Sequence, residues 1–97
     1  MFKHSEYEVA VLYNVPHVGE GRYFIYTFPN GYTALVCGNK FTFDGYRRHY
    51  ELEFQDNKGN TFKAPDFGGL IKTPGLWLDE EDTEQALKDI RTLEPIV

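Results

Sequence analysis

The sequence predicts an α+β fold, an antiparallel β-meander of about four to five strands with one C-terminal α-helix packed on one face. Two runs rich in β-branched and aromatic residues, Arg22–Phe28 and Tyr32–Cys37, flank a Pro-Asn-Gly turn that is typical of a hairpin. Ten of the sixteen aromatic residues lie between Tyr23 and Phe54, so we expect this segment to build the core. Convincing helical spacing of apolar residues occurs only near the C-terminus.

Length and composition indicate a single folded domain over residues 1–97. A chain of 97 residues buries roughly 60–65% of its unfolded surface, which is enough for one modest core. No apolar run approaches the length of a membrane span, and the start, Met1-Phe-Lys-His-Ser-Glu, has no apolar segment of a signal peptide. Cys37 is the single cysteine, so no internal disulfide is expected and a reducing cytoplasm is the expected compartment.

Alternation of side chains with a period of two locates the strands. The strand Arg22–Phe28 is bulky on both sides, which is typical of an interior strand. In the segment Tyr46–Gln55, apolar residues alternate with Glu51 and Glu53, so one face of that strand is expected to be wet. The expected strands are Glu6–Val15, Arg22–Phe28, Tyr32–Cys37, the short piece Phe41–Phe43, Tyr46–Gln55 and Thr61–Lys63.

The loop Pro65–Gly75 and the helix behind it complete the expected fold. Phe67, Leu70 and Ile71 should pack against the core although they lie in a loop rich in Gly and Pro. The helix begins behind Asp79, a good N-cap, and the acids that follow favour the positive end of the helix dipole. Its expected buried stripe is Ala86, Leu87, Ile90 and Leu93, and Pro95 is expected to end it.

The charge is placed unevenly along the chain, which limits the expected partners. Of the formal net charge of −5, the C-terminal segment Leu76–Val97 alone accounts for −5, and the rest of the chain sums to zero. General affinity for phosphate backbones needs clustered Lys and Arg, so nucleic acid is not the expected partner. No metal and no cofactor is expected either, because no pair of histidines has metal-ligand spacing and neither glycine-rich segment resembles a phosphate loop.

Two residues remain open as sites of chemistry. His49, beside Arg47 and Arg48, would bind an anion or act as a base, or it simply belongs to a polar stretch that enters an exposed strand. Cys37 would be a nucleophile if a histidine lay near it, or it is a small core residue at the end of an apolar strand. An enzyme using either residue would need a concave pocket around it.

Partner binding is the leading interpretation, and the candidate surface has two parts. The first is a half-exposed tyrosine face with neighbouring arginines, because tyrosine and arginine are favoured at binding hot spots. The second is the acidic helix start, which would meet a basic partner. The candidate residues are Tyr23, Tyr26, Tyr32, Tyr46, Arg47, Arg48, Asp79, Glu80, Glu81 and Asp82.

Two other uses of the same surface stay open. Sheet aromatics with Arg47, Arg48 and Lys40 would form a platform for a single-stranded nucleic acid. A two-sided aromatic sheet would also pair with a second copy through an exposed edge or face, which gives a homodimer.

Several short motifs resemble a group of small phage and prophage proteins of unknown function. They are the strand start Asn30-Gly31-Tyr32, the turn Phe41-Thr-Phe-Asp-Gly45, the strand Tyr50-Glu-Leu-Glu-Phe54 and the helix opening Leu76-Trp-Leu-Asp-Glu-Glu-Asp82. The chain departs from the group at Phe43-Asp44-Gly45, where a Gly pair is usual, and in a longer segment around Phe67–Pro74. The resemblance implies a phage-encoded accessory protein and carries over no catalytic residue. The leading hypothesis is therefore a non-enzymatic protein-binding module, and an inhibitor acting on a host or defence protein is its most concrete version.

Overall fold

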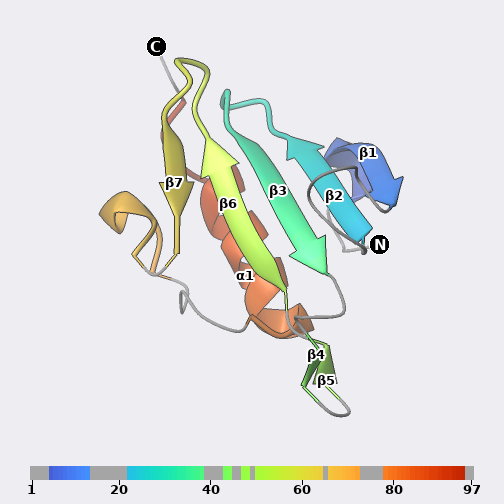
Figure 1. The fold of residues 1–97 in the computed structure, drawn as a ribbon. Coiled ribbons are helices and arrows are strands. Elements are labelled where there is room, and N and C mark those ends of the chain that lie inside the picture. Colours follow the sequence, from blue (N-terminus) through green and yellow to red (C-terminus); the bar gives the residue numbers. More distant parts are fainter. Residues whose placement is uncertain are drawn as a thin grey trace.

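The computed structural model has a five-stranded antiparallel sheet in the order β1-β2-β3-β6-β7, with the helix α1 lying across one face (Figure 1). This confirms the predicted α+β meander with one C-terminal helix. The structure describes residues 5–13, 22–38, 43–44, 47–48, 50–64, 66–72 and 78–95. The elements are η1 (Ser5–Tyr7), β1 (Glu8–Tyr13), β2 (Arg22–Thr27), β3 (Thr33–Gly38), β4 (Phe43–Asp44), β5 (Arg47–Arg48), β6 (Glu51–Gln55), β7 (Thr61–Lys63), η3 (Phe67–Gly69) and α1 (Glu80–Arg91).

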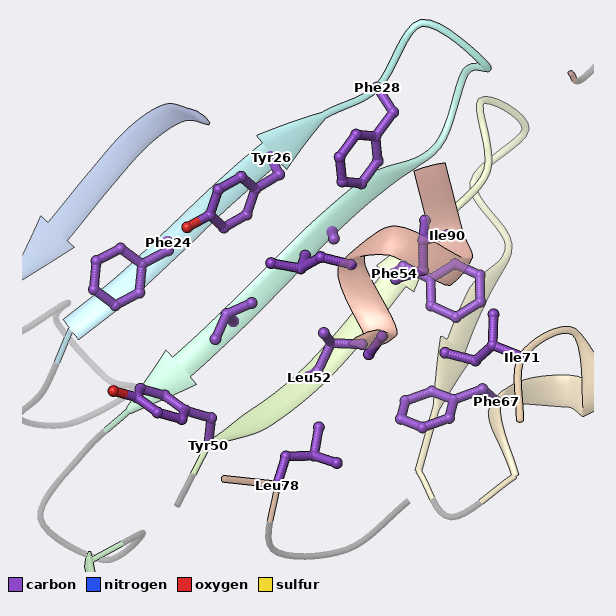
Figure 2. Close-up of a cluster of buried hydrophobic side chains, with 14 residues drawn as sticks. Phe24, Tyr26, Phe28, Tyr50, Leu52, Phe54, Phe67, Ile71, Leu78 and Ile90 are labelled. Atoms are coloured by element: carbon purple, nitrogen blue, oxygen red, sulfur yellow. The ribbon is translucent and has the colours of Figure 1, made fainter. Parts of the chain in front are cut away.

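Even-numbered residues of the inner strands point toward α1 and form the core (Figure 2). The strand register aligns them in rows across the sheet, so that Phe24 faces Val36 and Val36 faces Leu52. A second row carries Tyr26, Ala34 and Phe54, all without measurable exposure. β2 pairs on both sides, which confirms that this bulky strand is an interior one.

The helix α1 follows the predicted pattern at its start and differs at its end. Asp79 is the N-cap, and its carboxylate accepts a hydrogen bond of 2.7 Å from the Asp82 backbone N–H. Thr83, Ala86, Leu87 and Ile90 are buried on the sheet side. The expectation that Pro95 ends the helix is wrong, because α1 ends at Arg91 with Thr92 as its C-cap.

The buried side chain of Asn30 joins the β2–β3 turn to the end of α1. Its amide nitrogen Nδ2 lies 2.7 Å from the Ile90 carbonyl oxygen, 3.1 Å from that of Arg91 and 3.2 Å from that of Leu93. Its Oδ1 accepts a hydrogen bond of 3.2 Å from the Tyr32 backbone N–H. The last carbonyls of a helix have no partner within the helix, so this amide supplies donors that the helix lacks. We call this set of contacts the Asn30 clamp.

Two strand predictions need correction. The first strand was expected over Glu6–Val15, but β1 begins only at Glu8, and a bulge between Glu8 and Ala10 leaves Val9 63% exposed. The bulge breaks the period-two alternation on which the prediction rested. The expected strand Tyr46–Gln55 is divided into β5 in a separate two-stranded sheet and β6, with Tyr50 in an isolated bridge to Leu78. Position 15 lies outside the described residues.

The segment Phe67–Ile71 packs on the α1 side of the sheet, as predicted for Phe67 and Ile71. Phe67 has φ of +51° and a side chain with no exposure, stacked on Phe54 at a ring-centroid distance of 6.1 Å. A left-handed conformation costs a non-glycine residue about 1–2 kcal/mol, and burial of a phenylalanine offsets a cost of that size. Leu70 is 40% exposed, so the prediction that it packs is wrong for this residue.

Replacement of Asn30 tests the clamp. We expect Asn30→Ala to lower the free energy of unfolding by about 1–3 kcal/mol, because the Arg91 and Leu93 carbonyls lose the amide donor and the Ile90 carbonyl keeps only the Leu93 backbone N–H. Asn30→Asp should be worse at pH 7, since a carboxylate would face carbonyl oxygens at the negative end of the helix dipole. Acidification to about pH 3 should recover part of the loss, because a protonated carboxyl donates one hydrogen bond. Urea denaturation at the two pH values measures both effects.

Asn57 provides the matched control, since it is an exposed residue of the turn between β6 and β7. Asn57→Ala and Asn57→Asp should change stability by less than about 0.5 kcal/mol. Equal effects at the two positions would show that the clamp contributes nothing particular to stability.

Candidate binding surface on the open face of the sheet

On β2, β3, β6 and β7 the sheet face opposite α1 is formed by odd-numbered residues, and we call this four-stranded surface the open face. None of its residues belongs to the hydrophobic core cluster or packs against it. Its members are Tyr23, Ile25 and Thr27 from β2, Thr33, Leu35 and Cys37 from β3, Glu51, Glu53 and Gln55 from β6, and Thr61 and Lys63 from β7.

The open face changes from apolar to acidic across the strands. One row of cross-strand neighbours runs from Ile25 through Leu35 and Glu53 to Lys63. Ile25 and Leu35 are partly exposed, whereas Lys63 is exposed and pairs with Glu53 at an N–O distance of 3.7 Å. An exposed ion pair of this kind contributes about 0–1 kcal/mol, so it leaves the face open to a competing partner. Partly exposed apolar side chains therefore lie beside a charged border.

Tyr23 lies on this face, but only 4% of its surface is exposed. Its hydroxyl oxygen has no hydrogen-bond partner among the described residues. Burial raises the pKa of Tyr23 above its usual value. The neighbouring Cys37 adds to the rise through its charge and its side-chain interaction with the phenol, and Glu51 adds to it through its charge. The expectation that Tyr23 is half-exposed is therefore wrong, since the residue presents little surface to a partner.

The other expected tyrosines do not form one surface with it. Tyr26 has no exposure, faces α1 and donates a hydrogen bond of 3.2 Å from its hydroxyl to the Glu8 carboxylate. Tyr32 is half-buried and packs edge-on against Phe54, again on the α1 side. The predicted half-exposure is thus wrong for Tyr26 and holds for Tyr32, but neither residue shares a face with Tyr23. Tyr23 and Tyr26 lie three positions apart on β2, and residues separated by an odd number of positions point to opposite sides of a strand. Tyr46 lies outside the described residues.

The acidic helix start lies at the end of the sheet where β6 begins. Tyr50 and Leu78 form backbone hydrogen bonds in both directions, at 2.6 and 3.3 Å. Glu51 of the open face directly follows Tyr50, and Asp79 directly follows Leu78, so both acids lie next to this bridge. Glu51, Asp79, Glu80 and Glu81 are exposed and Asp82 is half-buried. We call these five residues the acidic end.

Arg47 and Arg48 form the strand β5, which pairs with β4 in a small hairpin. Figure 1 shows this hairpin projecting beyond the sheet at the same end as the start of α1. The side chains of both arginines lie outside the described part of the structure, so the surface assignment of Arg47 and Arg48 stays a prediction.

The residues considered for chemistry are only partly described. Cys37 is partly exposed on the open face of β3, a sheet surface rather than a pocket, and His49 lies outside the described residues. Among the residues that the structure covers, no three His, Cys, Asp or Glu side chains are grouped to hold a metal ion. No helix in the same part of the chain has the length and apolar character to cross a membrane.

Comparison of the chain with protein-family models, with curated proteins and with solved structures finds no match. The resemblance to small phage and prophage proteins therefore stays a prediction.

Sequence reasoning did not select Ile25, Leu35 or Glu53, although their alternation was visible. What it lacked was the register that places β2, β3 and β6 side by side and so makes one surface of them. Nothing in the sequence indicates that Leu78 joins Tyr50.

Replacement of Tyr23 tests its buried hydroxyl. At pH 7 Tyr23→Phe should be at least as stable as the wild type, because the lost hydroxyl has no partner among the described residues. Above pH 10 the unfolded phenol ionises while the folded one, with its raised pKa, keeps its proton. The wild type should therefore lose stability relative to Tyr23→Phe from the unfolded pKa up to the folded pKa, as urea denaturation between pH 7 and 11 will show.

Tyr32→Phe is the control for loss of a tyrosine elsewhere in the same sheet. If the difference between wild type and Tyr23→Phe does not change between pH 7 and 11, the raised pKa has no effect on folding.

Proposed function

We propose that this chain is a non-enzymatic protein-binding module of a bacterial cytoplasm. It acts as a phage-encoded accessory protein or inhibitor that occupies a host or defence protein. The observation that carries the proposal is the open face, where the partly exposed Leu35 and Cys37 lie beside Glu53 and Glu51, and Ile25 lies beside Leu35. The partner of this surface is a protein patch with apolar side chains bordered by Lys and Arg.

An apolar centre with a polar border is the usual anatomy of a protein interface. Ile25 and Leu35 are direct cross-strand neighbours, so their side chains form one apolar unit rather than two scattered residues. Thr27, Thr33 and Gln55 lie next to them and supply hydrogen-bonding groups at the border.

Its size indicates that the open face is only part of the interface. The four strands of the open face lie ~4.8 Å apart and have at most six residues at ~3.3 Å per residue, so the face spans at most roughly 14 by 20 Å. That is about 300 Å², compared with about 800 Å² per partner in a standard complex. The acidic end, which the Tyr50–Leu78 bridge joins to the start of β6, is the part of the molecule that we propose for further contact at this end of the sheet.

Charge supports a basic partner. The chain carries −5 overall, and the acidic end carries five carboxylates at one edge of the proposed interface. Complementary charge of this kind raises the association rate more than it raises the affinity, and salt screens it. The association rate should therefore depend on Glu51 and the helix start, while the dissociation rate depends on Leu35.

Binding of single-stranded nucleic acid is less well supported. Phe24, Tyr26 and Phe54 face α1 and are buried, so nucleobases could not stack on these aromatic rings. Glu51 and Glu53 on the other face would repel phosphates. A gel shift at low salt that Arg47→Ala/Arg48→Ala abolishes would replace the protein-binding proposal with this one.

Affinity capture from bacterial lysate with the wild-type chain, followed by binding measurements on Leu35→Lys, tests the proposed interface. The captured protein is identified by mass spectrometry, purified and titrated against each variant. Leu35→Lys should weaken its binding at least about tenfold, because a charge enters the apolar centre. Glu51→Lys should mainly slow association, and its effect should shrink as the salt concentration rises.

Val9→Lys is the matched control, since Val9 is an exposed apolar residue at the bulge of β1. Circular dichroism confirms that each variant is folded. Retention of the partner by Leu35→Lys would contradict the proposal. A wild-type dimer in sedimentation that Leu35→Lys turns into a monomer would instead identify a second copy as the occupant of the open face.

A further inference from the structure

A pocket lies at the opposite end of α1 from the acidic end. Its volume is about 310 Å³, at the lower limit of the range for small-molecule sites. Three segments meet there, namely η1, the β2–β3 turn and the chain behind α1. The lining residues are Tyr7, Pro29, Asn30, Arg91, Thr92, Leu93 and Pro95.

The walls of the pocket combine apolar and polar surface in about equal parts, and part of them is held in place. The Tyr7 ring packs edge-on against Phe28 at a centroid distance of 5.4 Å, so its position is supported by the core. Pro29, Leu93 and Pro95 supply further apolar surface. Asn30 uses its side chain in the clamp. The pocket is therefore preformed on its aromatic and turn sides.

The polar groups of the pocket are engaged, with one exception. The Thr92 hydroxyl lies 2.9 Å from the Lys88 carbonyl oxygen, to which it donates. Arg91, in contrast, forms no ion pair within the described part of the chain, and its Nε is buried there without a hydrogen-bond partner. A buried unsatisfied donor on a charged group requires an explanation, and a bound anion would provide one.

The electrostatics favour a carboxylate over a phosphate. The end of a helix carries the equivalent of about half a negative charge, here on carbonyls that Asn30 already binds. The single positive charge of Arg91 exceeds that value, so one monoanion is attracted. A phosphate dianion would meet the same partial negative charge without the backbone N–H groups that usually bind it. A planar carboxylate also matches the two parallel N–H groups of a guanidinium.

We propose that this pocket binds a ligand with an apolar or aromatic body that ends in a carboxylate. The body lies between Tyr7, Pro29 and Leu93, and the carboxylate pairs with Arg91. The ligand is a free small acid or the C-terminal residue of a peptide, since both present the same chemistry. The site is separate from the open face and does not depend on the function proposed for it.

Titration of the full chain, followed by ¹H–¹⁵N NMR, tests the pocket with 3-phenylpropionate, N-acetyl-Gly-Phe and inorganic phosphate. The two carboxylates should produce saturable shifts at Tyr7, Asn30 and Leu93, with a Kd on the order of 1 mM for the small acid. Inorganic phosphate should produce no saturable shifts. Nor should the two analogues in which the carboxylate is replaced by a carboxamide, 3-phenylpropionamide and N-acetyl-Gly-Phe amide. Tighter binding of the small acid would identify a free acid as the ligand type, and tighter binding of the dipeptide would identify a peptide terminus.

Arg91→Gln should weaken carboxylate binding at least about tenfold. Lys88→Gln is the matched control, because Lys88 is an exposed cation of the same helix turn that does not line the pocket. Unchanged binding in Arg91→Gln, equal loss in Lys88→Gln, equal binding of the amides, or absence of saturable shifts in the wild type would each overturn the proposal. The amide comparison uses the wild-type protein and so holds even if Arg91→Gln does not fold.

Discussion

The Asn30 clamp is the contact on which the arrangement of helix and sheet depends. A helix of 12 residues is ~18 Å long, close to the ~20 Å of a six-residue strand, so both ends of α1 reach the ends of the sheet. The Tyr50–Leu78 bridge fixes the first end, and Asn30 fixes the second across a sequence separation of 60 residues. Without both attachments, burial of Leu87 and Ile90 would fix the helix on the sheet but not its direction, because apolar contact is not directional.

Because α1 is held along one face, the aromatic residues that point to that face are buried beneath it. Phe24, Tyr26 and Phe54 are covered by the helix and by the Phe67–Ile71 segment, and they form the core. From the sequence, the Phe67–Ile71 segment was expected to pack against the core, and a target or a second copy was expected to contact the aromatic sheet. In the structure the loop packs on the α1 side, so it leaves the open face to other occupants. The capacity for binding therefore belongs to Ile25 and Leu35 rather than to the tyrosines.

Local signals predicted the elements well and the surface poorly. The Pro-Asn-Gly turn, the alternation in β6 and the Asp79 cap each depend on residues close in sequence, and all three were predicted correctly. The bulge at Val9 and the division of Tyr46–Gln55 were not predicted, since both result from pairing with segments distant in sequence. The predicted exposure of Tyr23 was wrong for a similar reason. Period-two alternation assigns a residue to a face of the sheet but does not show what lies against that face.

The charge order along α1 links its stability to the two proposed sites. Acids in the first turn and bases in the last turn stabilise the helix through its dipole, by about 0.3–1 kcal/mol each. The same order places the acidic end at one end of the molecule and Arg91 at the other. A change at Glu80 or Glu81 thus alters both helix stability and the charge offered to a partner. Leu35 lies on β3, outside the helix and away from its first turn, so its substitution separates binding from folding in a way that substitution in the helix cannot.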